Sequence, residues 1–172
     1  MRVGNAYISE TSKRNAKLKM KDKFEELYSE LPNLLSKLNA DLKPKWGTMH
    51  VLQMVNHLAT GFELSASYQE YKITTPEEKI PAFQRFLMSD KPFPHHSKMP
   101  QNYVDFPAIE SNDLESAKAR FLEKVRLLKE ATENDTDFWS VHENFGKLNA
   151  EQTRQLHFKH ITHHLTQFGV IS

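Results

Sequence analysis

Apolar residues recur at three- and four-residue steps in four stretches of the chain, a spacing that places them on one face of an α-helix. The first stripe begins at Phe24 and continues through Leu27, Tyr28, Leu31, Leu34, Leu35 and Leu38. Pro32 interrupts this stripe, and we expect it to kink the helix or split it in two. The segment ends in "LKPKWG", because Pro44 disfavours a helical residue before it.

Capping residues mark the starts of the next two long helices. Thr48 is the predicted N-cap of a helix that runs to about Gln69 and buries Val51, Met54, Val55, Leu58 and Phe62. Asn112, with Glu115 three residues later, predicts the start of another helix. Its inward positions are Leu114, Ala117, Phe121, Val125 and Leu128.

The remaining stretches predict a last long helix, a short one and a long loop. Asn149 and Gln152 form a capping box for the last helix, and Gly169 suits its C-terminal cap. Thr75 predicts the N-cap of a short helix within "TPEEKIPAFQRFLM". Residues 90–109 carry four of the eight prolines, which indicates a long irregular connection.

Four long helices joined by variable loops predict an all-α protein, a four-helix bundle with a long irregular crossover loop. The low glycine content, five in 172 residues, favours helices over a turn-rich β-fold. A chain of this length fits one domain, residues 1–172, of which residues 1–20 are expected to be a flexible or peripheral arm.

Charge and cysteine content exclude several kinds of chemistry. The net charge of +1 provides no general attraction to nucleic acid, and the basic stretch at residues 13–23 is expected to be a solvated arm or first helical turn. The chain has no cysteine, so any metal must be held by His, Asp or Glu. There is no apolar run of bilayer length and no signal-peptide core, which predicts a soluble cytoplasmic protein without membrane partners.

Four of the nine histidines lie in "HFKHITHHLTQFG" near the end of the chain. A helix turns about 100° per residue, so His157, His160 and His164 share one face and can converge, whereas His163 points elsewhere. That face borders the apolar stripe formed by Phe158, Ile161, Leu165 and Phe168.

The second helix shows the same relation between histidines and its buried face. His50 and His57 are seven residues apart, nearly eclipsed, and border that face. A His-x-x-x-His pair plus a third ligand from another helix forms a catalytic-type zinc arrangement, which also suits nickel or iron. The pattern alone leaves open both this metal site and a surface or capping role for the histidines.

Two segments carry a resemblance to a known group: "PKWGTMHVLQMVNHLATGF" (44–62) and "ENFGKLNAEQTRQLHFKHITHHLTQFGV" (143–170). Together they resemble the DinB/YfiT-like superfamily of metal-dependent proteins, in particular a branch with Trp-Gly before the second helix and a His-His-Leu-x-Gln-Phe-Gly ending. The resemblance implies a four-helix bundle, often a homodimer, with a divalent metal, zinc or nickel, on His57, His160 and His164. His50 and His157 are extra to that pattern and become candidate pocket residues or alternative ligands.

Characterised relatives in the superfamily include isomerases and S-transferases that use low-molecular-weight thiols. The resemblance thus implies a metal-dependent enzyme whose three-His site activates a thiol or water for transfer, isomerisation or hydrolysis of a small molecule. The alternative is a non-catalytic metal-binding or stress-response dimeric module, since no catalytic residue can be assigned. Gln167 and Glu63 are candidate partners of the ligand rings, and Gln167 is also a pocket candidate.

The other histidines have no assigned role. His95 and His96 fall in the long loop, where they either cap the cleft or face solvent. His142 precedes "ENFG", where the family often has a His-Pro, so the resemblance does not extend to it.

Overall fold

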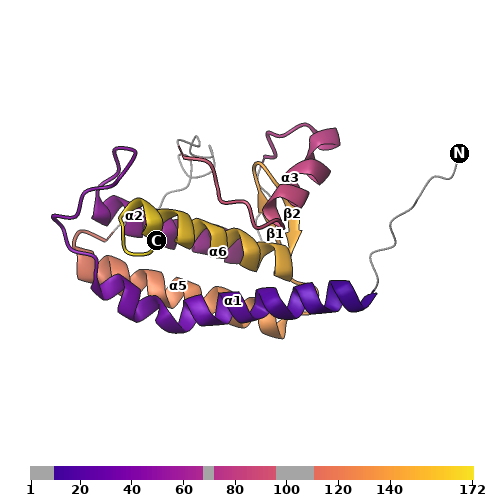
Figure 1. The fold of residues 1–172 in the computed structure, drawn as a ribbon, viewed down its shortest axis with the longest axis horizontal. Helices are drawn as coiled ribbons and strands as arrows, with labels where there is room; N and C mark the ends of the chain where they lie inside the picture. Colours follow the sequence, from indigo (N-terminus) through magenta and orange to yellow (C-terminus); the bar gives the residue numbers. More distant parts are fainter. Residues whose placement is uncertain (1–9, 68–71, 96–110) are drawn as a thin grey trace, which may run out of the picture.

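The computed structural model describes residues 10–67, 72–95 and 111–172, and most of them are helical (Figure 1). The elements are α1 (Glu10–Ser36), α2 (Val51–Ala66), the 3₁₀-helix η1 (Glu77–Lys79), α3 (Ile80–Leu87), α5 (Leu114–Asn134), β1 (Trp139–His142), β2 (Gly146–Asn149) and α6 (Ala150–Gln167). The predicted helical class is confirmed for the described residues. None of their helices is both long and apolar enough to cross a bilayer.

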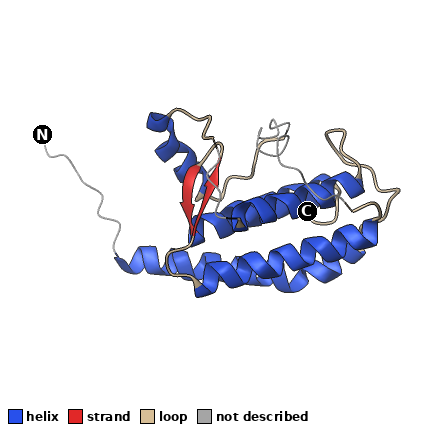
Figure 2. Ribbon diagram, turned by 180° about the vertical axis from the view of Figure 1, so that it is seen from behind, coloured by secondary structure: helices blue, strands red, loops and turns tan. Residues whose placement is uncertain are grey.

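The four long helices lie lengthwise against one another (Figures 1 and 2): α2 packs most extensively against α5, α1 packs against α6, and α2 also contacts α6. The predicted apolar stripes meet between them in one core. It contains Leu31, Leu34, Leu35 and Leu38 of α1, Met54, Val55, Leu58 and Phe62 of α2, Phe121, Val125 and Leu128 of α5, and Ile161 and Leu165 of α6. This packing fixes the relative position of α2 and α6, the two helices that carry the candidate ligands.

Helix α1 is one continuous element across Pro32, so of the two expected outcomes the split does not occur. Pro32 lies on the exposed face of the helix, where the carbonyl that loses its partner can turn toward water. Leu31 and Leu34 on either side of it are buried and hold both halves against the core. Helix α1 begins at Glu10, so residues 10–20 of the expected flexible or peripheral arm are helical.

Two predicted N-caps lie a short distance from the observed ones. His50, not Thr48, caps α2: its ring Nδ1 accepts from the Gln53 N–H at 3.2 Å, and the Gln53 side chain accepts from the His50 N–H at 3.0 Å. Asp113, not Asn112, caps α5, and its carboxylate accepts from the Ser116 N–H at 2.8 Å. Both helices therefore start later than predicted.

The two ends of α6 follow the prediction. The Asn149 and Gln152 capping box is present at its start. At its end Gly169 has a φ of +70°, and two bonds typical of a glycine-terminated helix follow. The Val170 N–H donates to the Leu165 carbonyl at 2.9 Å, and the Gly169 N–H donates to the Thr166 carbonyl at 3.0 Å.

A β-hairpin, which the sequence did not predict, packs with α3 over the first half of α6 (Figure 2). Strands β1 and β2 pair antiparallel, and a second small core joins them to both helices through Leu87, Phe145, Leu148 and Leu156. The expected N-cap at Thr75 is wrong, because the helical segment starts with η1 at Glu77. In the predicted 90–109 loop, residues 90–95 are irregular, and the rest lies outside the described residues.

Candidate metal centre

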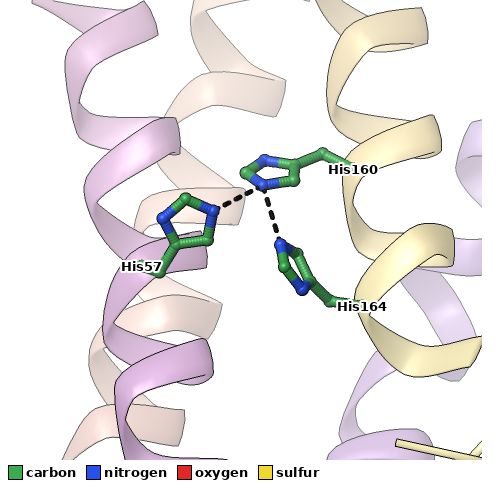
Figure 3. A group of neighbouring side chains, drawn as sticks. All are labelled: His57, His160 and His164. Atoms are coloured by element: carbon green, nitrogen blue, oxygen red, sulfur yellow. Dashed lines mark hydrogen bonds between the residues drawn. The ribbon is translucent and has the colours of Figure 1, made fainter. Parts of the chain in front are cut away.

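Three histidine rings from two helices meet beside the core (Figure 3). His57 projects from α2, while His160 and His164 lie one turn apart on α6. The Nε2 atom of His160 is 2.8 Å from Nε2 of His57 and 3.2 Å from Nε2 of His164. Three imidazole nitrogens therefore point at one small region, which is the arrangement expected of ligands around a single ion.

The distances within this cluster fit a metal ion. Zinc binds histidine at about 2.0–2.1 Å, so tetrahedral geometry requires ligand nitrogens about 3.4 Å apart. The measured separations of 2.8 and 3.2 Å are slightly shorter, and small ring rotations would open them. His164 is buried and the other two rings are half-buried, so the site lies at the edge of the helix packing.

All three rings are held in the neutral form, which is the form that binds a metal. Burial, followed by repulsion from His164 and His163, lowers the pKa of His57 to about 3. Burial lowers the pKa of His164 to about 4, and burial together with the neighbouring histidines lowers the pKa of His160 well below its usual range. At neutral pH each ring can thus present a lone pair, and metal affinity requires such deprotonated ligands.

Gln167 fixes which nitrogen of His164 carries the proton. Its side-chain NH₂ donates to the Trp46 carbonyl at 2.7 Å, so its Oε1 faces His164 Nδ1 at 2.8 Å as an acceptor. His164 must then donate from Nδ1, which leaves Nε2 with a free lone pair directed at the other two rings. A hydrogen bond of this kind orients a ligand and raises its basicity.

Trp46 and Gly47, the Trp-Gly pair before α2, pack against the side chain of Gln167. Gly47 has a φ of +78°, and a Cβ at this position would lie 2.9 Å from Gln167 Nε2. The Lys45 N–H donates to the Gln167 carbonyl at 2.7 Å, which ties the same segment to the end of α6. Glycine at position 47 therefore permits both the left-handed backbone and the close approach of Gln167.

His157 shares the stripe but does not join the cluster. It is 1% exposed, its Nε2 lies 2.8 Å from Ser65 Oγ, and its ring packs on Phe62 at 3.9 Å. Burial lowers its pKa to about 3. Its Nδ1 has no hydrogen-bond partner among the described residues, so the tautomer protonated at Nε2 avoids a buried unpaired N–H. His157 is thus buried in the helix packing, outside the group of three clustered histidines.

The remaining candidates lie elsewhere. His50 is exposed at the start of α2, where its ring serves as the N-cap. Glu63 does not reach the histidines, because its carboxylate accepts from Arg120 at 2.6 Å and Lys124 at 2.9 Å on α5. Of the two candidate partners, Glu63 therefore pairs with α5, whereas Gln167 hydrogen-bonds the ring of His164.

The other described histidines do not join the three nitrogens. His163 points away from them as predicted, and its ring lies edge-on to Trp46 at 5.6 Å. His95 stacks on the same Trp46 at 3.7 Å, and His142 packs against Phe145 in the hairpin. His96 lies outside the described residues.

Comparisons with protein-family models, with curated proteins and with solved structures gave no significant match. Fold and site together define a mostly helical protein with a partly buried three-histidine group that can bind a metal ion.

Proposed function

We propose that this protein is a divalent-metal-dependent enzyme with a DinB/YfiT-like four-helix bundle, in which His57, His160 and His164 hold zinc or nickel. The observation that carries the proposal is the convergence of three neutral Nε2 atoms on one point. The bond from His164 to Gln167 supports it, because it presets one ligand for coordination.

The chemistry proposed for this site is activation of a thiol or water for transfer, isomerisation or hydrolysis of a small molecule. A divalent ion on three neutral ligands keeps its charge and lowers the pKa of a thiol or water bound to it. We propose that a small substrate reaches the cluster on the side of His57 and His160, the two residues of the group that are only half-buried.

A non-catalytic metal-binding module is the second candidate, and one observation favours it. No Asp or Glu joins the three histidines among the residues that the structure describes, and the nearby Glu63 is committed to Arg120 and Lys124. A general base or acid from the chain itself is thus not evident at the site.

An activity assay on metal-loaded protein distinguishes the two candidate functions. Zinc- and nickel-loaded samples are tested against a panel of low-molecular-weight thiols with electrophiles, and against activated esters for hydrolysis. We expect turnover by the wild type, loss of turnover in His160→Ala, and retention in His50→Asn, which removes a histidine but preserves an N-cap. Stoichiometric metal without turnover on any of these substrates would instead support the non-catalytic module.

A further inference from the structure

A cavity of about 440 Å³ lies on α6, next to the last turn of α3 and the segment that follows it. Its wall includes Trp46, Phe93, His95, Phe158, Lys159 and His163. None of the three clustered histidines lines it. The volume is within the range of small-molecule pockets, about 300–1,000 Å³.

Aromatic rings form one side of this cavity, and one of them offers an unused hydrogen-bond donor. Trp46 and His95 are stacked with an interplanar angle of 11°, and His163 meets the Trp46 ring edge-on. The Trp46 Nε1–H is buried and has no acceptor among the described residues. A buried donor without a partner costs free energy, so a ligand that displaces the side chains covering this N–H and brings an acceptor atom would satisfy it.

Lys159 places a positive charge in the same cavity. The residue is 6% exposed, and its Nζ donates to the Phe86 carbonyl at 2.8 Å and lies 4.7 Å from the centre of the Phe86 ring. An ammonium group has three protons to donate, and no ion pair is formed by Lys159 within the described part of the chain. Asp90 in the same wall attracts this ammonium group without forming an ion pair with it, so the charge is only partly compensated and an anion is the ligand group that it favours most.

The other charges around the cavity leave this preference in place. The wall contains Lys23 and Lys91 in addition to Lys159, against two carboxylates, Asp90 and Glu151. Asp90 accepts from Lys23 at 3.2 Å, so part of its charge is neutralised. The cavity therefore combines aromatic surface, one free donor and an excess of positive charge.

We propose that this cavity is a second ligand site, which binds a small planar aromatic anion such as an aromatic carboxylate. The anionic group pairs with Lys159, the ring lies against the aromatic wall, and the Trp46 Nε1–H donates to an acceptor on the ligand. The proposal does not depend on the metal centre, because the cavity and the three-histidine cluster use different residues.

The test is isothermal titration calorimetry of the full-length protein with 2-naphthoate. Two matched compounds isolate the contributions: 2-naphthamide lacks the charge, and cyclohexanecarboxylate lacks the aromatic ring. We expect 2-naphthoate to bind at one site per chain and both analogues to bind at least tenfold more weakly. The proposal would be overturned if the wild-type protein bound 2-naphthamide as tightly as 2-naphthoate. It would also be overturned if the protein did not bind 2-naphthoate at about 1 mM.

Variants locate the site. Lys159→Met should weaken 2-naphthoate at least tenfold, and Trp46→Phe should weaken it severalfold. Lys147→Met is the matched control, because Lys147 also lies over an aromatic ring, 4.6 Å from the centre of Trp139, but does not line the cavity. Equal affinities of Lys159→Met and Lys147→Met would refute the assignment. Retained binding in His160→Ala separates this site from the metal centre.

Discussion

Gln167 links the end of α6 to the candidate metal centre, and its replacement by methionine tests that link. The substitution keeps the side-chain length but removes both hydrogen bonds, to His164 Nδ1 at 2.8 Å and to the Trp46 carbonyl at 2.7 Å. At about 1 kcal/mol net for each bond, the metal-free variant should lose about 2 kcal/mol of unfolding free energy. The change is close to isosteric, so a cavity contributes little to that loss.

The effect on metal binding is separate from this loss of stability. Without Gln167 the His164 ring is no longer held with its proton on Nδ1, and the Nε2 lone pair is less well directed at the site. Loss of such a partner typically weakens metal binding 10–100-fold, or about 1.4–2.8 kcal/mol. The assay is a zinc titration in competition with a chromophoric chelator at pH 7, together with urea unfolding of the metal-free protein.

The matched control is Gln155→Met, which replaces another buried glutamine on the same helix, about two and a half turns from His164. It should keep wild-type zinc affinity. If Gln167→Met also bound zinc as tightly as the wild type, the role given to Gln167 at the metal centre would be refuted.

Three further predictions follow from the same contacts. Gly47→Ala should lower the unfolding free energy by at least about 1–2 kcal/mol, the strain of an alanine in the left-handed conformation. Its Cβ would also lie 2.9 Å from Gln167 Nε2, so the substitution should weaken zinc binding as well. Urea unfolding measures the first effect and the chelator titration the second. Glu63→Gln should lower the unfolding free energy by about 1 kcal/mol through its lost ion pairs with α5, with zinc affinity unchanged. His157 stays neutral in the folded protein, its pKa lowered to about 3, but is protonated below about 6.5 when unfolded. This ring should therefore lower the unfolding free energy by about 1.4 kcal/mol per pH unit as the pH drops below 6.5. His157→Met should reduce the slope of unfolding free energy against pH, measured by urea unfolding, by that amount. An unchanged slope would contradict the burial argument.

Local patterns in the sequence predicted the helices, and they predicted that two of the three clustered histidines, His160 and His164, lie side by side on one helix face. The 3.6-residue period and the Asn149–Gln152 capping box depend only on neighbouring residues, and both appear in the structure. His160 and His164 share a face for the same reason. The third ring, His57, was assigned by resemblance, and the packing of α2 beside α6 brings it to 2.8 Å from His160.

What the sequence could not predict depends on distant partners. The burial of His157 depends on Ser65 and Phe62 of another helix, so its place on the histidine stripe was misleading. The engagement of Glu63 depends on α5. The hairpin was missed because strands of four residues are too short to show a clear alternation of apolar and polar positions, and because packing on α3 and α6 stabilises them.

His50 was misplaced for a different reason. Histidine is not among the preferred N-cap residues, so Thr48 was the better prediction from propensity. The side chain nevertheless accepts through Nδ1 as an asparagine oxygen would. The structure shows that one of the two histidines of α2 has a local structural role, and only His57 faces the candidate metal centre.

Metal stoichiometry shows directly whether His57, His160 and His164 hold an ion. The wild type, His160→Ala and His50→Asn are purified without chelator or nickel resin, incubated with zinc, freed of excess ion and measured by elemental analysis. We expect close to one zinc per chain in the wild type and His50→Asn, and close to none in His160→Ala. Equal zinc content in the wild type and His160→Ala, or none in the wild type, would contradict this expectation.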